Sequence, residues 1–172
     1  LVAAEPDLLL LAGDRNELLA AAVAALLTGT RIAHAYGGES TQGAIDDSVR
    51  HALTQLADVH FVAAEPYAAR VRGMVPSESA VYTVGAPALC ALDRVPLPSL
   101  PEAEDYLSFD LARPFLLVTV QPVTRNPVET GAILEAIESL FASNHQVRGV
   151  ITGANADLGG QHVNDRLRDL AR

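Results

Sequence analysis

Residues 34–51 read HAYGGESTQGAIDDSVRH, and the fold expected for the chain is worked out from this stretch. It begins at the end of a short apolar run, passes the adjacent Gly37 and Gly38, and continues into a helical pattern. Paired glycines permit backbone conformations, or close approach of a ligand, that a side chain would forbid. A polar loop between two regular elements commonly carries the chemistry of a rigid scaffold. This strand–loop–helix unit is therefore the candidate functional centre.

The helix expected after this loop carries Asp46 and Asp47 in its first turn, where the helix macrodipole favours negative charge. At a spacing of four residues, Asp46 faces Arg50 and Asp47 faces His51. A solvated helix start with two surface ion pairs is the ordinary alternative. The layout of the remaining chain favours a functional site instead.

The rest of the chain alternates short apolar runs with helical patterns. The unbroken apolar run at 8–11 is typical of a parallel strand covered on both faces. Further strands are expected at 31–33, 59–63, 81–84, 115–120 and 147–152. Helices are expected at 17–28, 43–56, 128–141 and 161–171, and another begins at Glu65 and Pro66. This alternation predicts the α/β class, with right-handed βαβ units on parallel sheets.

Polar motifs follow the expected strands at the point where each strand ends. In parallel sheets, ligands bind beyond these carboxyl ends. The motifs lie at residues 13–15, 34–39, 85–87, 121–124 and 153–157. Their common placement predicts a ligand site more firmly than any one of them does alone.

A change of composition divides the chain. Prolines 96, 98 and 101 and several acids lie between Val95 and Pro114, with little apolar periodicity. Such a segment is typical of a connection between domains. We expect a linker at 96–113 between a domain at 1–95 and another at 114–172.

Composition excludes several classes of protein. With 172 residues, 49% of them apolar, the chain has the make-up of an ordinary globular protein. The net charge of −9 argues against nucleic acid or an anionic membrane surface as partner. The longest apolar stretch, 18–27, is about half of what a membrane-spanning helix needs. Cys90 is the single cysteine, which excludes a disulfide within the chain and predicts a reducing cytoplasm.

Several motifs together resemble one enzyme family. They are GDRNE at 13–17, HAYGGE at 34–39, GAIDDSVRHALTQLADVHF at 43–61, VGAP at 84–87, QPVT at 121–124 and GANADLGG at 153–160. In this order they resemble the hydrolysing UDP-N-acetylglucosamine 2-epimerases of sialic-acid and related nonulosonate pathways. The resemblance covers essentially the whole chain and implies an internal fragment of such an enzyme.

The resemblance also implies an architecture: two Rossmann-like halves of the glycosyltransferase-B type, both incomplete in this chain. Residues 1–95 would be the second half of the N-terminal domain, and residues 114–172 the first half of the C-terminal domain. The implied partners are a UDP-sugar substrate and further copies of the full-length protein in a homo-oligomer.

The reaction implied by the resemblance removes the proton on C2 of the sugar and expels UDP from C1. Water then adds to the glycal-like intermediate and gives free N-acetylmannosamine. Carboxylates and imidazoles with separated pKa values can do this without a metal or cofactor.

Carried over residue by residue, the resemblance gives the candidate site. The catalytic candidates are Asp14, Glu39, Asp46 and Asp47. The substrate-binding candidates are Arg15, His34, Tyr36, Gly38, Arg50, His51, Gln121, Asn155 and Asp157. For Asp14 the alternative is a capping box with Glu17 at the start of the following helix.

Two positions depart from the family pattern. Relatives carry glutamate or histidine where this chain has Tyr36, and histidine where it has Gln121. Tyrosine, with an ordinary pKa of about 10, is a poor base at neutral pH, and glutamine cannot exchange a proton. These departures leave open a catalytically impaired UDP-sugar-binding relative. A glycosyltransferase of the same architecture is the third possibility.

Overall fold

The structure of the chain is a computed structural model that describes residues 3–42, 44–92 and 94–171. The chain divides into two compact units, Leu1–Pro96 and Leu97–Arg172. Each unit is described here by itself.

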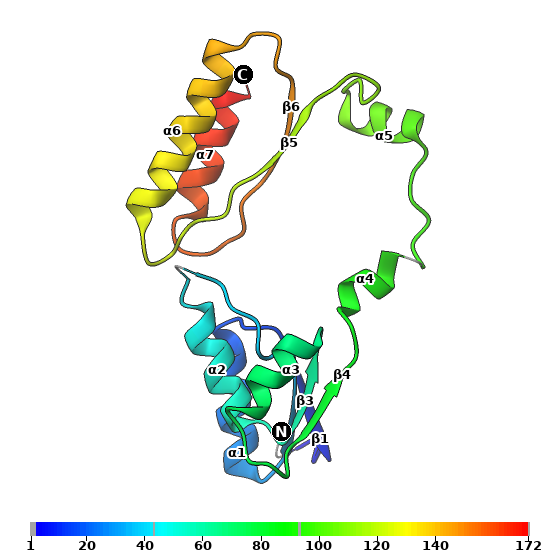
Figure 1. Cartoon of the computed structure of the whole chain (residues 1–172), viewed down its shortest axis with the longest axis vertical. Coiled ribbons are helices and arrows are strands. Elements are labelled where there is room, and N and C mark those ends of the chain that lie inside the picture. Colours follow the sequence, from blue (N-terminus) through cyan, green and yellow to red (C-terminus); the bar gives the residue numbers. More distant parts are fainter. Residues whose placement is uncertain (1–2, 43, 93, 172) are drawn as a thin grey trace. The chain divides into compact units, whose positions relative to one another are not determined.

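The first unit is built on four parallel strands in the order β1-β2-β3-β4 (Figure 1). The strands are β1 (Leu8–Ala12), β2 (Arg31–Ala35), β3 (Val59–Val62) and β4 (Ala80–Thr83). Between them run α1 (Glu17–Thr28), α2 (Asp46–Leu56) and α3 (Glu65–Arg72), and α4 (Pro87–Leu92) follows the last strand. This is the βαβ alternation expected from the sequence, on a parallel sheet.

Helices pack against one face of this sheet. Leu11 and Ile32 point to the same face and form a buried cluster with Ala25 of α1 and Leu53 of α2. A second cluster joins Val62, Ala68 and Val71.

The opposite face of the sheet is open within the described residues. Leu8, Leu10 and Tyr82 remain 46%, 60% and 54% exposed. Strand residues alternate between the two faces, so half of the run at 8–11 lacks cover. The expectation that this strand is covered on both faces is wrong for the part of the chain that the structure describes.

The ends of α1 settle the alternative for Asp14. The helix begins at Glu17 with Asn16 at the N-cap and no side-chain cap, so the capping box that would start at Asp14 is not formed. Gly29, with a φ of 70°, ends the helix in the left-handed conformation that glycine adopts easily. The start of α2 expected at Gly43 lies outside the described residues, and the helix is seen from Asp46.

The second unit contains a two-stranded parallel sheet, β5 (Leu116–Thr119) and β6 (Gly149–Thr152). Its helices are α5 (Leu100–Leu107), α6 (Pro127–Ser143) and α7 (Gly160–Leu170). Figure 1 shows α6 and α7 lying side by side. Their buried residues Leu134, Val163 and Leu167 pack against Val120, just beyond β5.

The segment expected as a linker carries regular structure. Helix α5 lies inside residues 96–113 and starts with a capping box, in which Glu102 accepts a hydrogen bond of 2.8 Å from the Ser99 backbone N–H. The division between the units falls between Pro96 and Leu97. No helix in the described parts of the chain is both long and apolar enough to cross a membrane.

Candidate functional site

The Arg50 cluster (Asp14, Asp47 and Arg50) lies beyond the carboxyl end of β1 and at the start of α2. The Arg50 side chain is only 4% exposed and forms ion pairs with Asp14 through Nη2 and with Asp47 through Nη1. It also donates to the Glu39 carbonyl at 3.1 Å and to the Thr41 hydroxyl at 3.2 Å. A buried charge is tolerated only when it is paired and hydrogen-bonded. Arg50 therefore fixes the loops that follow β1 and β2 onto α2.

Asp47 is fully engaged by neighbouring donors. Its carboxylate accepts from the Thr41 backbone N–H at 2.7 Å and from the Ser40 hydroxyl at 2.9 Å, besides Arg50. Burial raises the pKa of Asp47, but these hydrogen bonds and the charge of Arg50 outweigh it, so the pKa is lowered. Asp47 is thus an ionised anchor for the loop and is poorly suited to donate a proton.

The side chains of Asp14 and Glu39 have fewer contacts than that of Asp47 within the described residues. The Asp14 side chain keeps 28% exposure while its Oδ2 contacts Arg50. Within the described residues, the carboxylate of Glu39 has no hydrogen-bond or ion-pair partner, although its carbonyl is held by Arg50. The structure thus brings Asp14 and the backbone of Glu39 to the same guanidinium.

The ion pairs differ from those expected from helical spacing. Arg50 pairs with Asp47 three residues earlier and with Asp14 from the distant loop. His51 has a buried Nε2 that finds no partner among the described residues. Asp46, the first residue of α2, is half-buried beside Asp47. Arg50 thus pairs with Asp14 from the loop after β1 as well as with Asp47 at the start of its own helix.

His34, at the end of β2, is fully buried. Its Nε2 lies 2.9 Å from the Gly13 carbonyl oxygen and its Nδ1 lies 3.2 Å from Oγ1 of Thr54. Burial lowers the pKa of His34, and Arg50 lowers it further, against the opposing effects of the Gly13 hydrogen bond and Asp14. His34 is therefore neutral at pH 7, with both ring nitrogens in contact with protein atoms.

Gly38 brings the central loop against α3. Its φ is 82°, and a Cβ there would press into the Tyr67 carbonyl oxygen, so the position needs glycine for conformation and for space. Arg70 donates to the Gly38 carbonyl from the same helix. Tyr36 also has a positive φ, 69°, and its hydroxyl accepts a hydrogen bond of 3.3 Å from the Ala88 backbone N–H. A non-glycine residue in this conformation is often found at functional sites.

In the second unit, three predicted residues lie together beyond β5 and β6. Gln121 Oε1 accepts from the Asn155 backbone N–H at 2.8 Å, and Asn155 Nδ2 donates to Asp157 at 2.7 Å. The two strand-end loops are thus tied to each other.

Arg15, in the first unit, is half-exposed and pairs with Glu17 at 3.3 Å.

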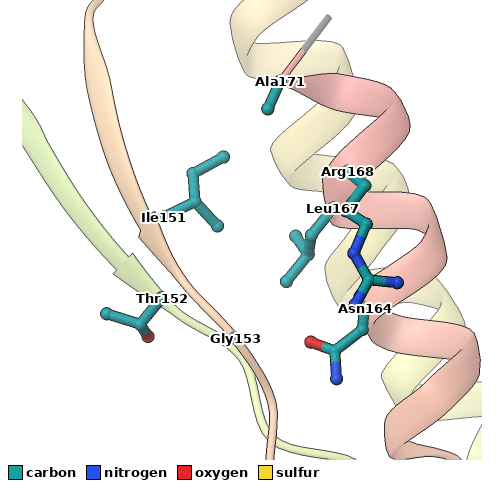
Figure 2. A pocket seen from close by; sticks show the side chains of 7 residues that line it. All are labelled: Ile151, Thr152, Gly153, Asn164, Leu167, Arg168 and Ala171. Atoms are coloured by element: carbon teal, nitrogen blue, oxygen red, sulfur yellow. The ribbon is translucent and has the colours of Figure 1, made fainter. Parts of the chain in front are cut away.

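A pocket of about 250 Å³ lies between β6 and α7 (Figure 2). Its lining residues are Ile151, Thr152, Gly153, Asn164, Leu167, Arg168 and Ala171. None of the predicted site residues lines it. Asn164 is bonded to the backbone of Ala154, and Arg168 is paired with Asp165, so its principal polar groups are already occupied.

Three polar contributors to the site were missed from the sequence. Ser40 and Thr41 hold Asp47, and Thr54 contacts His34. Ser40 and Thr41 belong to the quoted stretch 34–51, and Thr54 lies one helical turn after Arg50. That spacing was the available signal. Within residues 3–42, 44–92 and 94–171, no group of three or more His, Cys, Asp or Glu side chains could hold a metal ion.

Comparison with known proteins decides the family. The family model described as UDP-N-acetylglucosamine 2-epimerase matches residues 1–172. The chain belongs to this family. The UDP-N-acetylglucosamine 2-epimerase family was the one predicted from the motifs, and that prediction is confirmed.

Two curated members of the family are similar to this chain over most of its length. The GDP/UDP-N,N'-diacetylbacillosamine 2-epimerase (hydrolyzing) of Campylobacter jejuni is 30% identical over 98% of the chain. The UDP-N,N'-diacetylbacillosamine 2-epimerase (hydrolyzing) of Legionella pneumophila is 31% identical over 95% of it. The chain spans 44% and 43% of the length of these relatives.

A solved structure confirms the fold that was predicted for this chain. The UDP-GlcNAc 2-epimerase of Neisseria meningitidis bound to UDP-GlcNAc matches 96% of this chain with a TM-score of 0.75, at 19% identity. The chain corresponds to 46% of that structure. The α/β architecture with parallel sheets, of the glycosyltransferase-B-like type, is therefore shared with this family of enzymes.

Proposed function

We propose that the intact protein is a hydrolysing UDP-sugar 2-epimerase that converts UDP-N-acetylglucosamine to N-acetylmannosamine and UDP. The Arg50 cluster carries this proposal, because it holds Asp14, a predicted catalytic acid, beyond the carboxyl end of the first strand, with Asp47 anchoring the same arginine. Ligands of parallel α/β sheets bind at that edge. Residues 1–95 and 114–172 are proposed as parts of two Rossmann-like domains joined at 96–113.

The acidic residues of the site have different proposed roles. Asp14 and Glu39 exchange the protons at the sugar, since the other carboxylate of the network, Asp47, is committed to three donors. Arg50 keeps Asp14 in place, and Asp46 supplies further negative charge at the start of α2. Removal of the C2 proton and loss of UDP from C1 give a glycal-like intermediate, to which water adds.

The other predicted site residues are proposed to bind the substrate. Arg15, Tyr36 and His51 are proposed to bind substrate in the first unit. Gln121, Asn155 and Asp157 are proposed to do so from the second unit. Gln121 cannot exchange a proton, so the amide acts as a hydrogen-bonding group.

The sugar has a second candidate. Both relatives described above are named for N,N'-diacetylbacillosamine, and they match nearly the whole chain. A UDP-linked sugar with a second acetamido group is therefore the alternative substrate, with the same chemistry at C1 and C2.

The departures at Tyr36 and Gln121 favour one competing function, a relative that binds UDP-sugar without turning it over. We further propose a cytoplasmic homo-oligomer, a location supported by the single Cys90. Light scattering on the intact protein tests the assembly.

Product analysis separates these possibilities. The intact protein is incubated with UDP-N-acetylglucosamine and, separately, with UDP-N,N'-diacetylbacillosamine, and the products are followed by NMR. Release of UDP with an equal amount of free 2-epimerised sugar supports the proposal. A 2-epimerised UDP-sugar without release of UDP refutes hydrolysis, and binding without any product supports the impaired relative.

A further inference from the structure

A buried chain of hydrogen bonds runs behind the Arg50 cluster. From the Gly13 carbonyl it passes through the His34 ring to the Thr54 hydroxyl, with contacts of 2.9 and 3.2 Å. The same hydroxyl then meets the Arg50 carbonyl at 2.8 Å. Gly13 precedes Asp14, and Arg50 is the partner of Asp14. The chain therefore connects the two backbones whose side chains form the central ion pair.

The side chains that form these hydrogen bonds are buried away from solvent. His34 and Thr54 are both 0% exposed. A Cβ on Gly37 would lie 3.1 Å from Thr54 Oγ1 and 3.4 Å from His34 Nδ1, so the central loop packs directly over the contact. In such a low-dielectric setting a hydrogen bond is strong and an unpaired polar group is costly.

Counting protons shows why the Thr54 hydroxyl matters. The Gly13 carbonyl can only accept, so His34 Nε2 carries the proton, and Nδ1 of the neutral ring is an acceptor. Thr54 therefore brings its single hydroxyl proton to two acceptors, His34 Nδ1 and the Arg50 carbonyl oxygen. Removing this hydroxyl leaves both acceptors without the donor.

We propose that His34 and Thr54 are positioning residues, which hold the Asp14 loop and the Arg50 turn of α2 in the geometry needed for catalysis. This inference rests on the proposed function. Because His34 is 0% exposed and both of its ring nitrogens contact protein atoms, it acts through Gly13 and Thr54 in place of the substrate contact expected from the sequence. A displacement of about 1 Å at a catalytic group can cost roughly 100-fold in rate, so hydrogen bonds that fix the Asp14 loop relative to Arg50 affect the rate strongly.

Two substitutions at Thr54 separate positioning from packing. Thr54→Val keeps the shape and removes the hydroxyl, whereas Thr54→Ser keeps the hydroxyl and removes a methyl group. In the intact protein, the proposal predicts that Thr54→Val lowers kcat for UDP release by roughly 10- to 100-fold with little change in KM, and that Thr54→Ser keeps most of the activity. A packing role predicts the opposite order, and that order would overturn the proposal.

A second measurement does not depend on activity. Urea unfolding is compared for wild type, Thr54→Val, Asp14→Asn and the double variant. If these hydrogen bonds couple Thr54 to Asp14, the effects of the two single substitutions on the free energy of unfolding are not additive. Additive effects overturn the positioning role. If the wild type releases no UDP, the proposed function fails, and this measurement alone decides about His34 and Thr54.

Discussion

Arg50 and Asp14 form an ion pair across 36 residues of sequence, joining α2 to the loop beyond β1. The guanidinium is almost fully buried, whereas the Asp14 carboxylate remains partly open to solvent. A cation held beneath an accessible carboxylate fixes that carboxylate in place without blocking it. This relationship organises the candidate site of the first unit.

Removing the buried cation of Arg50 should lower the stability of the fold. Arg50→Met leaves Asp14 and Asp47 without their cation, and we expect the free energy of unfolding to fall by about 2–3 kcal/mol, since both carboxylates keep some solvent. Urea unfolding of the intact protein measures this change. Arg72→Met, which breaks the exposed pair with Glu65, is the matched control and should leave stability unchanged. Equal effects of the two substitutions would contradict the account.

Asp47 should make stability depend on pH in the acid range. Its pKa is lowered in the folded chain, so the unfolded chain binds more protons in acid. The stabilisation is complete above the ordinary aspartate pKa of about 3.9 and is lost as the pH falls through the lower folded pKa. Urea unfolding between pH 3 and pH 7 should show a shallower acid loss for Asp47→Asn than for wild type. An unchanged profile would show that Asp47 is not anchored as described.

His60 should destabilise the fold, because it is fully buried and neither ring nitrogen has a partner within the described residues. Burial lowers its pKa, as does neighbouring His34, while Asp58 opposes the shift. Protonation below about pH 6.5 therefore favours unfolding, and stability falls from there toward the lower folded pKa. His60→Leu should raise the free energy of unfolding by about 1 kcal/mol and flatten this slope. A loss of stability would mean that the ring is satisfied after all.

Gly38 should not tolerate a side chain. Gly38→Ala forces an unfavourable φ and a clash with the Tyr67 carbonyl, and we expect a loss of about 1–3 kcal/mol in thermal unfolding. Gly73→Ala is the control in the same unit, because its φ is −75° and its nearest neighbour is 3.4 Å away. That substitution should be neutral or stabilise by up to about 1 kcal/mol.

Much of the fold follows from local pattern. The helix at 17–28 was predicted with the bounds that α1 has, since alanine and leucine favour helix throughout and Gly29 ends it. The first four strands were placed correctly to within two residues at each end, because short apolar runs alternate with helices. Helix α5 was not predicted, because Pro101, the prolines just before the helix and its acids are typical of a linker, although its capping box is a local signal.

The site was harder to predict, because its partners come from distant parts of the chain. Helical spacing suggested that Arg50 would pair within its own helix, but burial brings Asp14 to it. The role of Thr54 depends on the position of His34 on a neighbouring strand, which no local pattern contains. Residue type and motif therefore pointed to the right region, and packing decided which groups are bonded to each other.

The most direct test of the central claim is hydrogen exchange at C2 of the sugar. The intact protein and its Asp14→Asn variant are incubated with UDP-N-acetylglucosamine in D2O, and released UDP and deuterium at C2 are measured together. The account predicts that wild type releases UDP and free sugar carrying deuterium at C2, and that Asp14→Asn is slower by about 10²–10⁴-fold. Release of UDP at the wild-type rate by Asp14→Asn would contradict the account.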